Sequence, residues 1–286
     1  MPRLSEGRPI SSEPPSDLVA GAATGSVLQL NRTRLLGVRV DDISQSALID
    51  HIVSAIARQR PLHILNTNAH LINLAQRRPW LIELFDQSGI AFCDGAGVQL
   101  AVWLRTGRKL ARHTPPQWID PLARRLAVAG ATVYWLGGRP EAVEAAARRM
   151  EARTGLRCVG QHHGYFDMTP GCRDNEAVLA DIAQAAPDLL LLNMGMPIQE
   201  RWLFDNRDRL AVPVVITAGA LVDHAAGLVR RPPAWVADAG LEWLVRLVVE
   251  PRRLWRRYLL GLPIFGLRLA WDCAKVRLTH ASANRT

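Results

Sequence analysis

Asp94 stands directly after the apolar run 90–93 and directly before Gly95. A carboxylate at the end of a buried strand is partly desolvated, which makes it a stronger base than an aspartate in water. Such a group suits reactions in which one carboxylate takes the proton of an attacking hydroxyl. Aspartate is also a common N-cap, and it would cap a helix over 95–104, so both roles stay open.

Polar and glycine residues also follow the other apolar runs of the chain. A ligand in a parallel α/β sheet binds beyond the carboxyl ends of the strands, so residues just after the strands are the informative ones. The positions singled out in this way are Asn66, Asn68, Gly137, Gly138, Tyr165, Phe166, Gly195, Gln199 and Asp223. We expect Gln199 and Asp223 to lie at this crevice rather than in the core. The pair Gly137-Gly138 either cradles a phosphate at a helix N-terminus or forms a plain tight turn before Pro140.

Short apolar runs alternate with helical patterns from Thr33 onward. The runs span 63–65, 90–93, 132–136, 156–159, 189–193 and 212–217. The helical patterns span 41–59, 68–76, 98–104, 121–129, 140–153, 174–185 and 199–209. Strands that are buried on both faces appear as continuous apolar runs, so the pattern predicts an α/β fold with a Rossmann-like parallel sheet and helices on both faces. Asp41 and Asp42 are interpreted as an N-cap with charge that favours a helix start.

Composition fits a globular chain and places the charge at one end. Of 286 residues 49% are hydrophobic and 21% charged, which excludes wholesale disorder. No apolar stretch reaches the ~20 residues of a membrane span. The net charge is +9, and +7 of it lies in the last 57 residues, so we expect an anionic partner at that end. The four cysteines are widely spaced and favour reduced thiols in the cytoplasm.

The C-terminal segment combines arginines with tryptophans. Pro251 is expected to end one helix and to start the next. If the two helices are roughly coaxial, Arg246, Arg253 and Arg256 fall on one face. A solvated basic face explains this pattern. A site for a diphosphate lipid or an anionic bilayer explains it as well, and the neighbouring Trp243 favours the second explanation.

Several common sites are missing from the sequence. The dinucleotide and P-loop glycine motifs do not occur, which disfavours a nicotinamide enzyme or a P-loop NTPase. No zinc-type Cys/His cluster or D-x-D clamp occurs either, and the pair His162-His163 has no third ligand nearby. We therefore expect no cofactor and no metal, and any diphosphate must be held by arginines and backbone N–H groups.

Six motifs together carry a resemblance to a known family. They are Asp94-Gly95-x-Gly97, Leu136-Gly137-Gly138-x-Pro140, Gly164-Tyr165-Phe166, Gly195-x-Pro197-x-Gln199-Glu200, Asp223-x-x-Ala226-Gly227-x-Val229-x-Arg231-x-Pro233-x-Trp235, and Gly240-Leu241-Glu242-Trp243-x-x-Arg246-Leu247 followed by Glu250-Pro251-x-Arg253-Leu254-x-Arg256-x-Tyr258. With them the chain resembles the WecG/TagA/CpsF glycosyltransferases over about residues 33–265. The resemblance implies a Rossmann-like core with a C-terminal appendage and metal-independent, inverting chemistry.

The same resemblance implies roles for individual residues. It makes Asp94 the general base and places Asn66 and Asn68 on the acceptor side, although the family often has Thr-Pro-Asn where this chain has Asn66-Thr67-Asn68. Arg112 is retained from a family Glu-Arg-x-x-Gly motif whose glycine is lost here. Substrate-binding roles fall on Arg112, Gln199 and Asp223, nucleotide-binding roles on Gly137, Gly138, Tyr165, Phe166 and Gly195, and diphosphate-binding roles on Arg246, Arg253 and Arg256.

These observations lead to a domain plan and a function. We expect a flexible leader over 1–27, a glycosyltransferase core over 28–230 and a basic, Trp-rich helical appendage over 231–286 that completes the active site at the membrane. The expected reaction moves N-acetylmannosamine, its uronic acid or glucose from a UDP-sugar to a polyprenyl-diphosphate-linked sugar in surface-polysaccharide or teichoic-acid-like biosynthesis.

The expected enzyme is cytoplasmic and bound peripherally to the inner membrane face. It binds no nucleic acid, and its exposed Trp-rich tail leaves a homo-oligomer open. The alternative is a basic adaptor that binds membrane or nucleic acid on an inactive α/β scaffold.

Overall fold

In the described part of the chain, eight strands form one sheet in the order β1-β2-β4-β3-β8-β7-β5-β6. The computed structural model describes residues 30–229, 236 and 239–283, without the side chains of residue 253 and of residues from 275 onward. The strands are β1 (Asn31–Leu35), β2 (Val38–Asp42), β3 (Leu62–Thr67), β4 (Ile90–Cys93), β5 (Thr132–Gly137), β6 (Arg157–His162), β7 (Leu189–Asn193) and β8 (Val214–Thr217). All neighbouring strands pair in parallel except β1 and β2. The predicted α/β fold is confirmed, with an antiparallel strand added at one edge.

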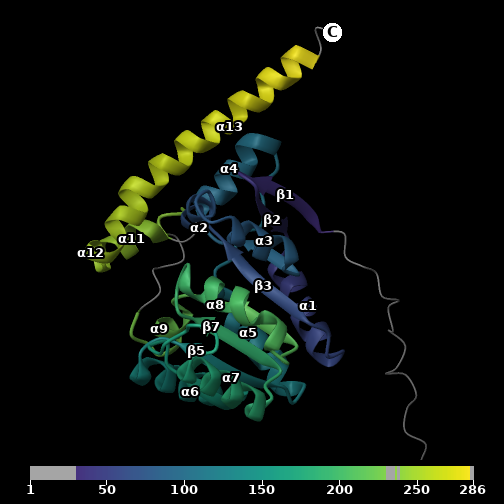
Figure 1. Cartoon of the computed structure of the whole chain (residues 1–286), viewed down its shortest axis with the longest axis vertical. Coiled ribbons are helices and arrows are strands. Elements are labelled where there is room, and N and C mark those ends of the chain that lie inside the picture. Colours follow the sequence, from purple (N-terminus) through teal and green to yellow (C-terminus); the bar gives the residue numbers. More distant parts are fainter. Residues whose placement is uncertain (1–29, 230–235, 237–238, 284–286) are drawn as a thin grey trace, which may run out of the picture. The chain divides into compact units, whose positions relative to one another are not determined.

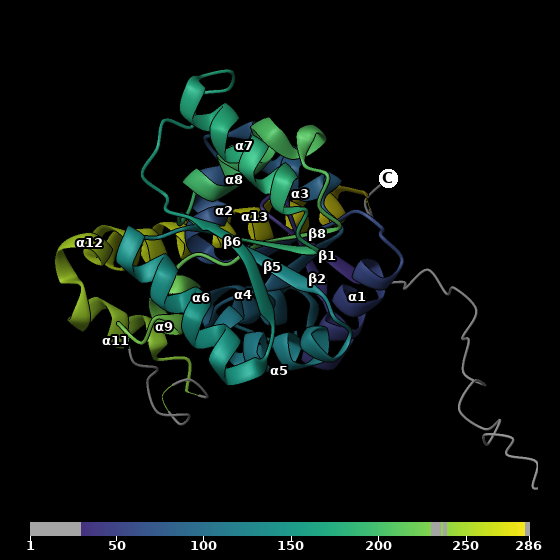
Figure 2. The same ribbon diagram turned by 90° about the horizontal axis from the view of Figure 1, so that it is seen from below.

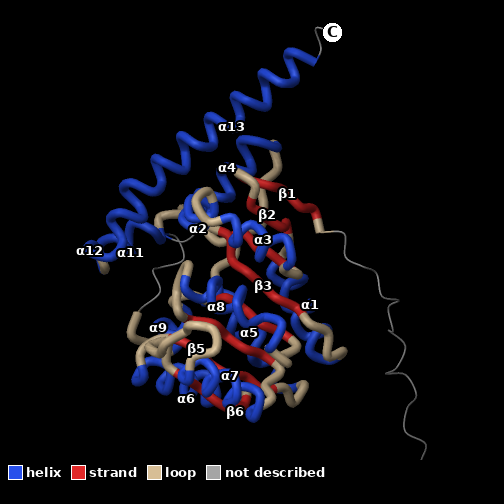
Figure 3. Tube along the Cα trace, in the orientation of Figure 1, coloured by secondary structure: helices blue, strands red, loops and turns tan. Residues whose placement is uncertain are grey.

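Helices cover both faces of this sheet. They are α1 (Gln45–Ala57), α2 (Ala69–Ala75), α3 (Pro79–Gln87), α4 (Ala96–Thr106), α5 (Pro115–Val128), α6 (Pro140–Thr154), α7 (Arg173–Ala185), α8 (Ile198–Asn206) and α9 (Leu221–Ala225), with a 3₁₀ turn η1 (Arg207–Arg209) after α8. Figure 2 shows α7 and α8 on one side of the sheet and α5 and α6 on the other. The red strands in Figure 3 run between these two layers.

The central strands form where the sequence is continuously apolar. Every residue of β4, β5, β7 and β8 is buried. A strand with helices on both faces has no solvated side, so alternation of polar and apolar residues disappears and short apolar runs remain. All six runs found in the sequence appear as strands, and this reason applies to the inner ones, because β6 at the sheet edge is only partly buried.

The β1–β2 hairpin was not expected from the sequence. The interpretation of Asp41 as part of a helix N-cap is wrong, because Asp41 lies in β2 and is completely buried. Helix α1 begins later, at Gln45, and is capped by Ser44, whose hydroxyl accepts the N–H of Ala47. The charged residues of this hairpin concealed its strand character.

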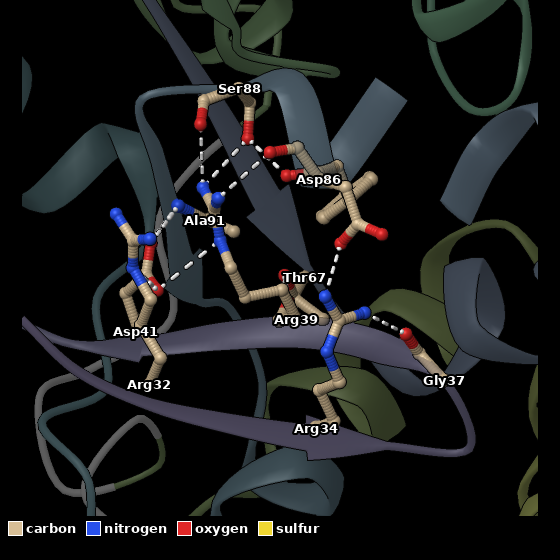
Figure 4. Close-up of polar contacts among 10 residues, drawn as sticks. Arg32, Arg34, Gly37, Arg39, Asp41, Thr67, Asp86, Ser88 and Ala91 are labelled. Carbon is tan, nitrogen blue, oxygen red and sulfur yellow. Dashed lines mark hydrogen bonds and ion pairs between the residues drawn. The ribbon is translucent and has the colours of Figure 1, made fainter. Parts of the chain in front are cut away.

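A buried ion pair fixes the hairpin to the rest of the sheet (Figure 4). Arg39 Nε lies 3.3 Å from Asp41 Oδ1 without hydrogen-bond geometry, and Arg39 Nη2 donates to the backbone oxygen and hydroxyl of Ser88. Asp41 in turn accepts the N–H of Ala91, 2.7 Å away. Burial raises the pKa of Asp41 and lowers that of Arg39, so each charge is stable only because these partners compensate for lost water.

The C-terminal segment is helical. It contains α11 (Glu242–Val249), α12 (Pro251–Trp255), the π-helical turn η2 (Arg256–Leu260) and α13 (Gly261–Ala283). Pro251 begins α12 directly after α11 ends, which confirms the expected helix break. Helix α13 packs beside α2 and reaches α4 (Figure 1).

Two boundary predictions are not tested by the structure. The leader over 1–27 and the boundary at 230–231, with Arg231, Pro233 and Trp235 of the motif, lie outside the described residues. Among the helices that are described, none is both long and apolar enough to cross a membrane.

Replacement of Arg39 by methionine tests the buried pair. Arg39→Met removes the buried cation beside the Asp41 carboxylate and leaves only the exposed Arg32, 3.6 Å away, and the N–H of Ala91, so the free energy of unfolding should fall by about 3–5 kcal/mol. Arg34 lies opposite on β1 and its side chain is 55% exposed, so Arg34→Met should cost at most about 1 kcal/mol. Urea denaturation followed by circular dichroism measures the free energy of unfolding of both variants. Equal losses of stability would show that the buried ion pair contributes no more than the exposed one.

Candidate active site

The carboxyl ends of β3, β4 and β8 bring three polar side chains into one hydrogen-bonded row. Asn66 Nδ2 donates to Asp94 Oδ2 at 2.8 Å, and Thr217 Oγ1 donates to Asn66 Oδ1 at 3.1 Å. β3 pairs with both β4 and β8, so these strand ends are neighbours in the sheet. Asn66 is buried and Asp94 is half-buried. The row therefore holds one carboxylate in a fixed orientation at the edge where α/β proteins bind ligands.

Asp94 does not act as a helix cap. Helix α4 begins at Ala96, its N-cap is Gly95 with φ +121°, and no side chain accepts a hydrogen bond there. The left-handed backbone of Gly95 turns the chain sharply between strand and helix, which glycine tolerates at little cost. Asp94 therefore does not cap α4, and its carboxylate accepts a hydrogen bond from Asn66 instead.

Asn68 caps the neighbouring helix α2. Its Oδ1 accepts the N–H of Leu71 at 3.0 Å, and its Nδ2 lies 3.3 Å from the sulfur of Met196. Asn68 is 8% exposed and packs beside Gly95. It lies next to the Asp94 turn, but part of its hydrogen-bonding capacity already serves the fold.

The glycine pair at the end of β5 is required by crowding of the backbone. A Cβ on Gly137, where φ is +122°, would lie 2.4 Å from the carbonyl carbon of Asn193, and one on Gly138 would lie 2.9 Å from Val222. These contacts explain the residue type without any ligand. The nucleotide-binding role of Gly137 and Gly138 stays a prediction.

Gln199 and Glu200 are both completely buried at the start of α8. Gln199 Oε1 accepts the N–H of Gly219, and its Nε2 donates to Glu200 Oε1 at 2.8 Å. The expectation that Gln199 lies outside the core is wrong, because it is completely buried and its amide joins α8 to the turn after β8. The substrate-binding role of Gln199 stays a prediction. Burial raises the pKa of Glu200 to about 7, and its Oε2 has no hydrogen-bond partner among the described residues.

The other predicted nucleotide residues follow β6 and β7. Tyr165 is exposed, while the Phe166 ring meets the edge of His162 at 5.3 Å. Gly195 has φ +76° and open space around its Cα. Asp223 is half-buried in α9, where its backbone carbonyl accepts the N–H of Leu228. Substrate contact by these four residues stays a prediction.

The structure separates the predicted cations. Arg246 Nη2 lies 3.4 Å from His224 Nε2, beside Asp223. Arg112 pairs with Glu242 at 3.6 Å and so joins the loop after α4 to α11. Arg256 lines a pocket against α2. The side chain of Arg253 lies outside the described residues.

Comparison with known proteins identifies the family. The model of the glycosyl transferase WecG/TagA/CpsF family matches residues 33–279. The chain belongs to this family. It is similar to the N-acetylglucosaminyldiphosphoundecaprenol N-acetyl-beta-D-mannosaminyltransferase of Staphylococcus aureus strain NCTC 8325, with 28% identity over 85% of this chain and 94% of that protein. The protein of the same name from strain MRSA252 is 27% identical over the same shares.

Membership in the WecG/TagA/CpsF family makes this chain a glycosyltransferase and decides against an inactive adaptor scaffold. The structure adds to the row at Asp94 one residue that the sequence did not reveal. Thr217 anchors Asn66, and it is only the last residue of an apolar run in the sequence. Thr217 and Asn66 are 151 positions apart in the sequence, so no local sequence pattern indicates their contact.

Glu200 gives this glycosyltransferase a pH-dependent stability. A raised carboxyl pKa means that the folded state favours the neutral form, so stability is full below about pH 4.5 and falls as pH rises through about 7. Glu200→Gln keeps a neutral side chain and should be more stable than wild type at pH 8 by about 3 kcal/mol.

Urea denaturation at pH 5 and pH 8 checks this, because the advantage of the variant should nearly vanish at pH 5. Glu141→Gln, the same change at an exposed position of α6, serves as the control. An advantage of Glu200→Gln that is independent of pH would contradict the titration of Glu200.

Proposed function

We propose that this protein transfers a hexose-type sugar from a UDP-sugar to a sugar linked to a polyprenyl diphosphate, with inversion at the anomeric carbon and without a metal ion. The product serves surface-polysaccharide or teichoic-acid-like biosynthesis. The proposal extends the family's glycosyltransferase chemistry to a donor and an acceptor class, and it is supported by the name of the S. aureus relatives.

The observation that carries the proposal is the fixed carboxylate of Asp94. It takes the proton of the acceptor hydroxyl as that oxygen forms a bond to the anomeric carbon. The bond from this carbon to the diphosphate oxygen breaks at the same time, and uridine diphosphate leaves with the electron pair. Asn66 keeps Asp94 in place by donating to Oδ2, which leaves the other carboxylate oxygen for the incoming hydroxyl.

Negative charge develops on the departing diphosphate and requires cations or N–H donors. Arg246 on α11 serves this purpose in our proposal, together with Arg253 from the same appendage. Arg246 lies beside His224 in α9. Helix α9 follows β8, the strand whose Thr217 accepts from and donates to Asn66. Arginines suit this role because guanidinium groups form charge-assisted, paired hydrogen bonds to phosphate oxygens.

Among the three expected sugars, the relatives' name favours N-acetylmannosamine. The proposed contact with the bilayer is made by the appendage, where basic residues alternate with exposed apolar ones such as Trp255 and Leu259. Such a surface binds anionic headgroups with about 1 kcal/mol per basic residue. We propose a peripheral position at the cytoplasmic membrane face.

Replacement of the base is the central test. Asp94→Asn keeps the size and the bonded oxygen but cannot accept the proton, so turnover should fall by ~10²–10⁴ while affinity for uridine diphosphate stays unchanged. Asp50→Asn, on the exposed surface of α1, provides the matched control with full turnover. Turnover of Asp94→Asn near that of wild type would remove Asp94 from the mechanism.

A donor screen tests substrate and metal together. We expect UDP-N-acetylmannosamine to give the highest kcat/KM with an N-acetylglucosaminyl diphosphate carrying a short soluble alkyl chain. The rate should be the same after dialysis against a chelator, because the proposed cations are arginines. Loss of turnover on chelation and its return with a divalent cation would contradict metal independence.

A further inference from the structure

A pocket of about 480 Å³ lies between α2 and the appendage. Its lining comes from two segments far apart in the sequence, α2 with the two residues after Gln76, and η2 with the first turns of α13. The residues are His70, Asn73, Leu74, Arg77, Arg78, Arg256, Arg257, Leu260, Gly261, Ile264 and Arg268. Asn73 connects the two walls, since its Nδ2 donates to the backbone oxygen of Gly261 and its Oδ1 accepts from Arg268.

The lining of this pocket, as far as the chain is described, has five arginines and no carboxylate. Arg256 and Arg257 stack on the rings of the residues before and after them, Trp255 and Tyr258. The Nε of Arg257 is buried without a hydrogen-bond partner among the described residues. A buried guanidinium donor without an acceptor is costly, so an anion that accepts its hydrogen bond would bind favourably in this pocket.

His70 responds to the same positive field. Burial, with the charges of Arg257 and Arg78, lowers its pKa to about 4. The imidazole is therefore neutral at physiological pH, and the positive charge of the pocket comes from guanidinium groups. Guanidinium groups bind phosphate oxygens in pairs of parallel hydrogen bonds, which fits a ligand with several phosphate oxygens.

An exposed apolar row begins at the rim of the pocket. Leu260, Ile264, Leu267 and Trp271 follow one another at spacings of four, three and four residues, which places them on one face of the helix. They are between 44% and 73% exposed. We call these four residues the α13 stripe, and it extends over about 16 Å. A cationic pocket that continues into an apolar stripe matches an amphiphile with an anionic head and a hydrocarbon tail.

The pocket also lies near the proposed base. Asn68, the N-cap of α2, packs against Gly95 next to Asp94, and Gly97 packs against Ala69 and Leu262. Along α2, Asn73 is five residues from Asn68, or about 8 Å. In a diphosphate-linked acceptor sugar, one pyranose ring separates the attacking hydroxyl from the diphosphate. The pocket is therefore at a suitable distance along α2 for that diphosphate.

We infer that this pocket binds the diphosphate of the lipid-linked acceptor and that the first isoprene units lie on the α13 stripe. The inference rests on the proposed function and adds the position of the acceptor's lipid end. The two diphosphates of the reaction then bind at separate places. The diphosphate of the donor lies beside α9 and α11, and the diphosphate of the acceptor lies beside α2 and α13. Arg77 and Arg78 thereby become acceptor-binding residues.

Calorimetric titration with farnesyl diphosphate, in saturating uridine diphosphate to fill the donor site, tests binding without turnover. The double variant Arg77→Gln/Arg78→Gln should bind farnesyl diphosphate at least about tenfold more weakly than wild type. The control Arg58→Gln/Arg60→Gln removes the same charge from exposed positions after α1 and should bind like wild type. Equal affinity of all three proteins would overturn the inference.

A second double variant tests the role of the α13 stripe. Ile264→Gln/Leu267→Gln should weaken farnesyl diphosphate at least about fivefold and leave inorganic diphosphate unchanged, because only the hydrocarbon contact is lost. Sedimentation of the same variant tests another occupant, a second copy of the chain. A dimeric wild type that becomes monomeric in this variant, with farnesyl diphosphate affinity unchanged, would make the stripe a subunit interface and overturn the inference.

Steady-state kinetics with the soluble acceptor test whether the pocket binds the diphosphate of the acceptor, the diphosphate of the donor or the phosphate of a lipid headgroup. Arg77→Gln/Arg78→Gln should raise the acceptor KM at least about tenfold while the donor KM and the affinity for uridine diphosphate stay constant. Loss of uridine diphosphate affinity would assign the pocket to the donor. An unchanged acceptor KM with lost flotation on phosphatidylglycerol vesicles would assign it to bilayer headgroups, and either result overturns the inference.

These outcomes also separate this inference from the proposed function. A wild type that binds farnesyl diphosphate through Arg77 and Arg78 but transfers no sugar from any donor would contradict the proposed function alone. A wild type that transfers sugar, with an acceptor KM unaffected by the double variant, would contradict the pocket assignment alone.

Discussion

The hydrogen bond from Asn66 to Asp94 sets the geometry on which the crevice depends. It joins the ends of two parallel strands, and Thr217 on a third strand fixes its donor. A carboxylate that is held in this way does not reorganise when a substrate hydroxyl arrives, and preorganisation is what makes polar groups effective in catalysis. The buried sheet below the row supplies the rigidity, because every residue of β4 and β8 is inside the core.

The appendage brings cations to this rigid edge from two directions. Arg246 approaches from α11 toward α9, and Arg256 and Arg257 face α2. The proposed reaction brings together two diphosphates, which repel each other strongly in a partly desolvated site. In that proposal the arginines of α11 and those of the pocket beside α2 each bind one of the two diphosphates.

Glu200 is buried at the start of α8, where burial raises its pKa and the charge of Arg257 opposes that rise. Its neighbour Gln199 fixes the turn after β8, directly beyond Thr217. Both side chains of the Gln199-Glu200 motif are closed off from solvent and hold the strand ends together. Contact of Gln199 with substrate stays a prediction.

Local patterns in the sequence are sufficient to predict the strands of the central sheet and the break at Pro251. They also single out Asp94, whose role as the base stays a prediction. Apolar runs are sufficient to indicate buried strands. Only the tertiary structure decided that Asp41 pairs with Arg39 inside the sheet and that Asn66 meets Thr217. It also brought Arg77 and Arg257 to one pocket. These contacts join residues distant in the chain, and burial and charge compensation between such residues have no periodicity that a sequence displays.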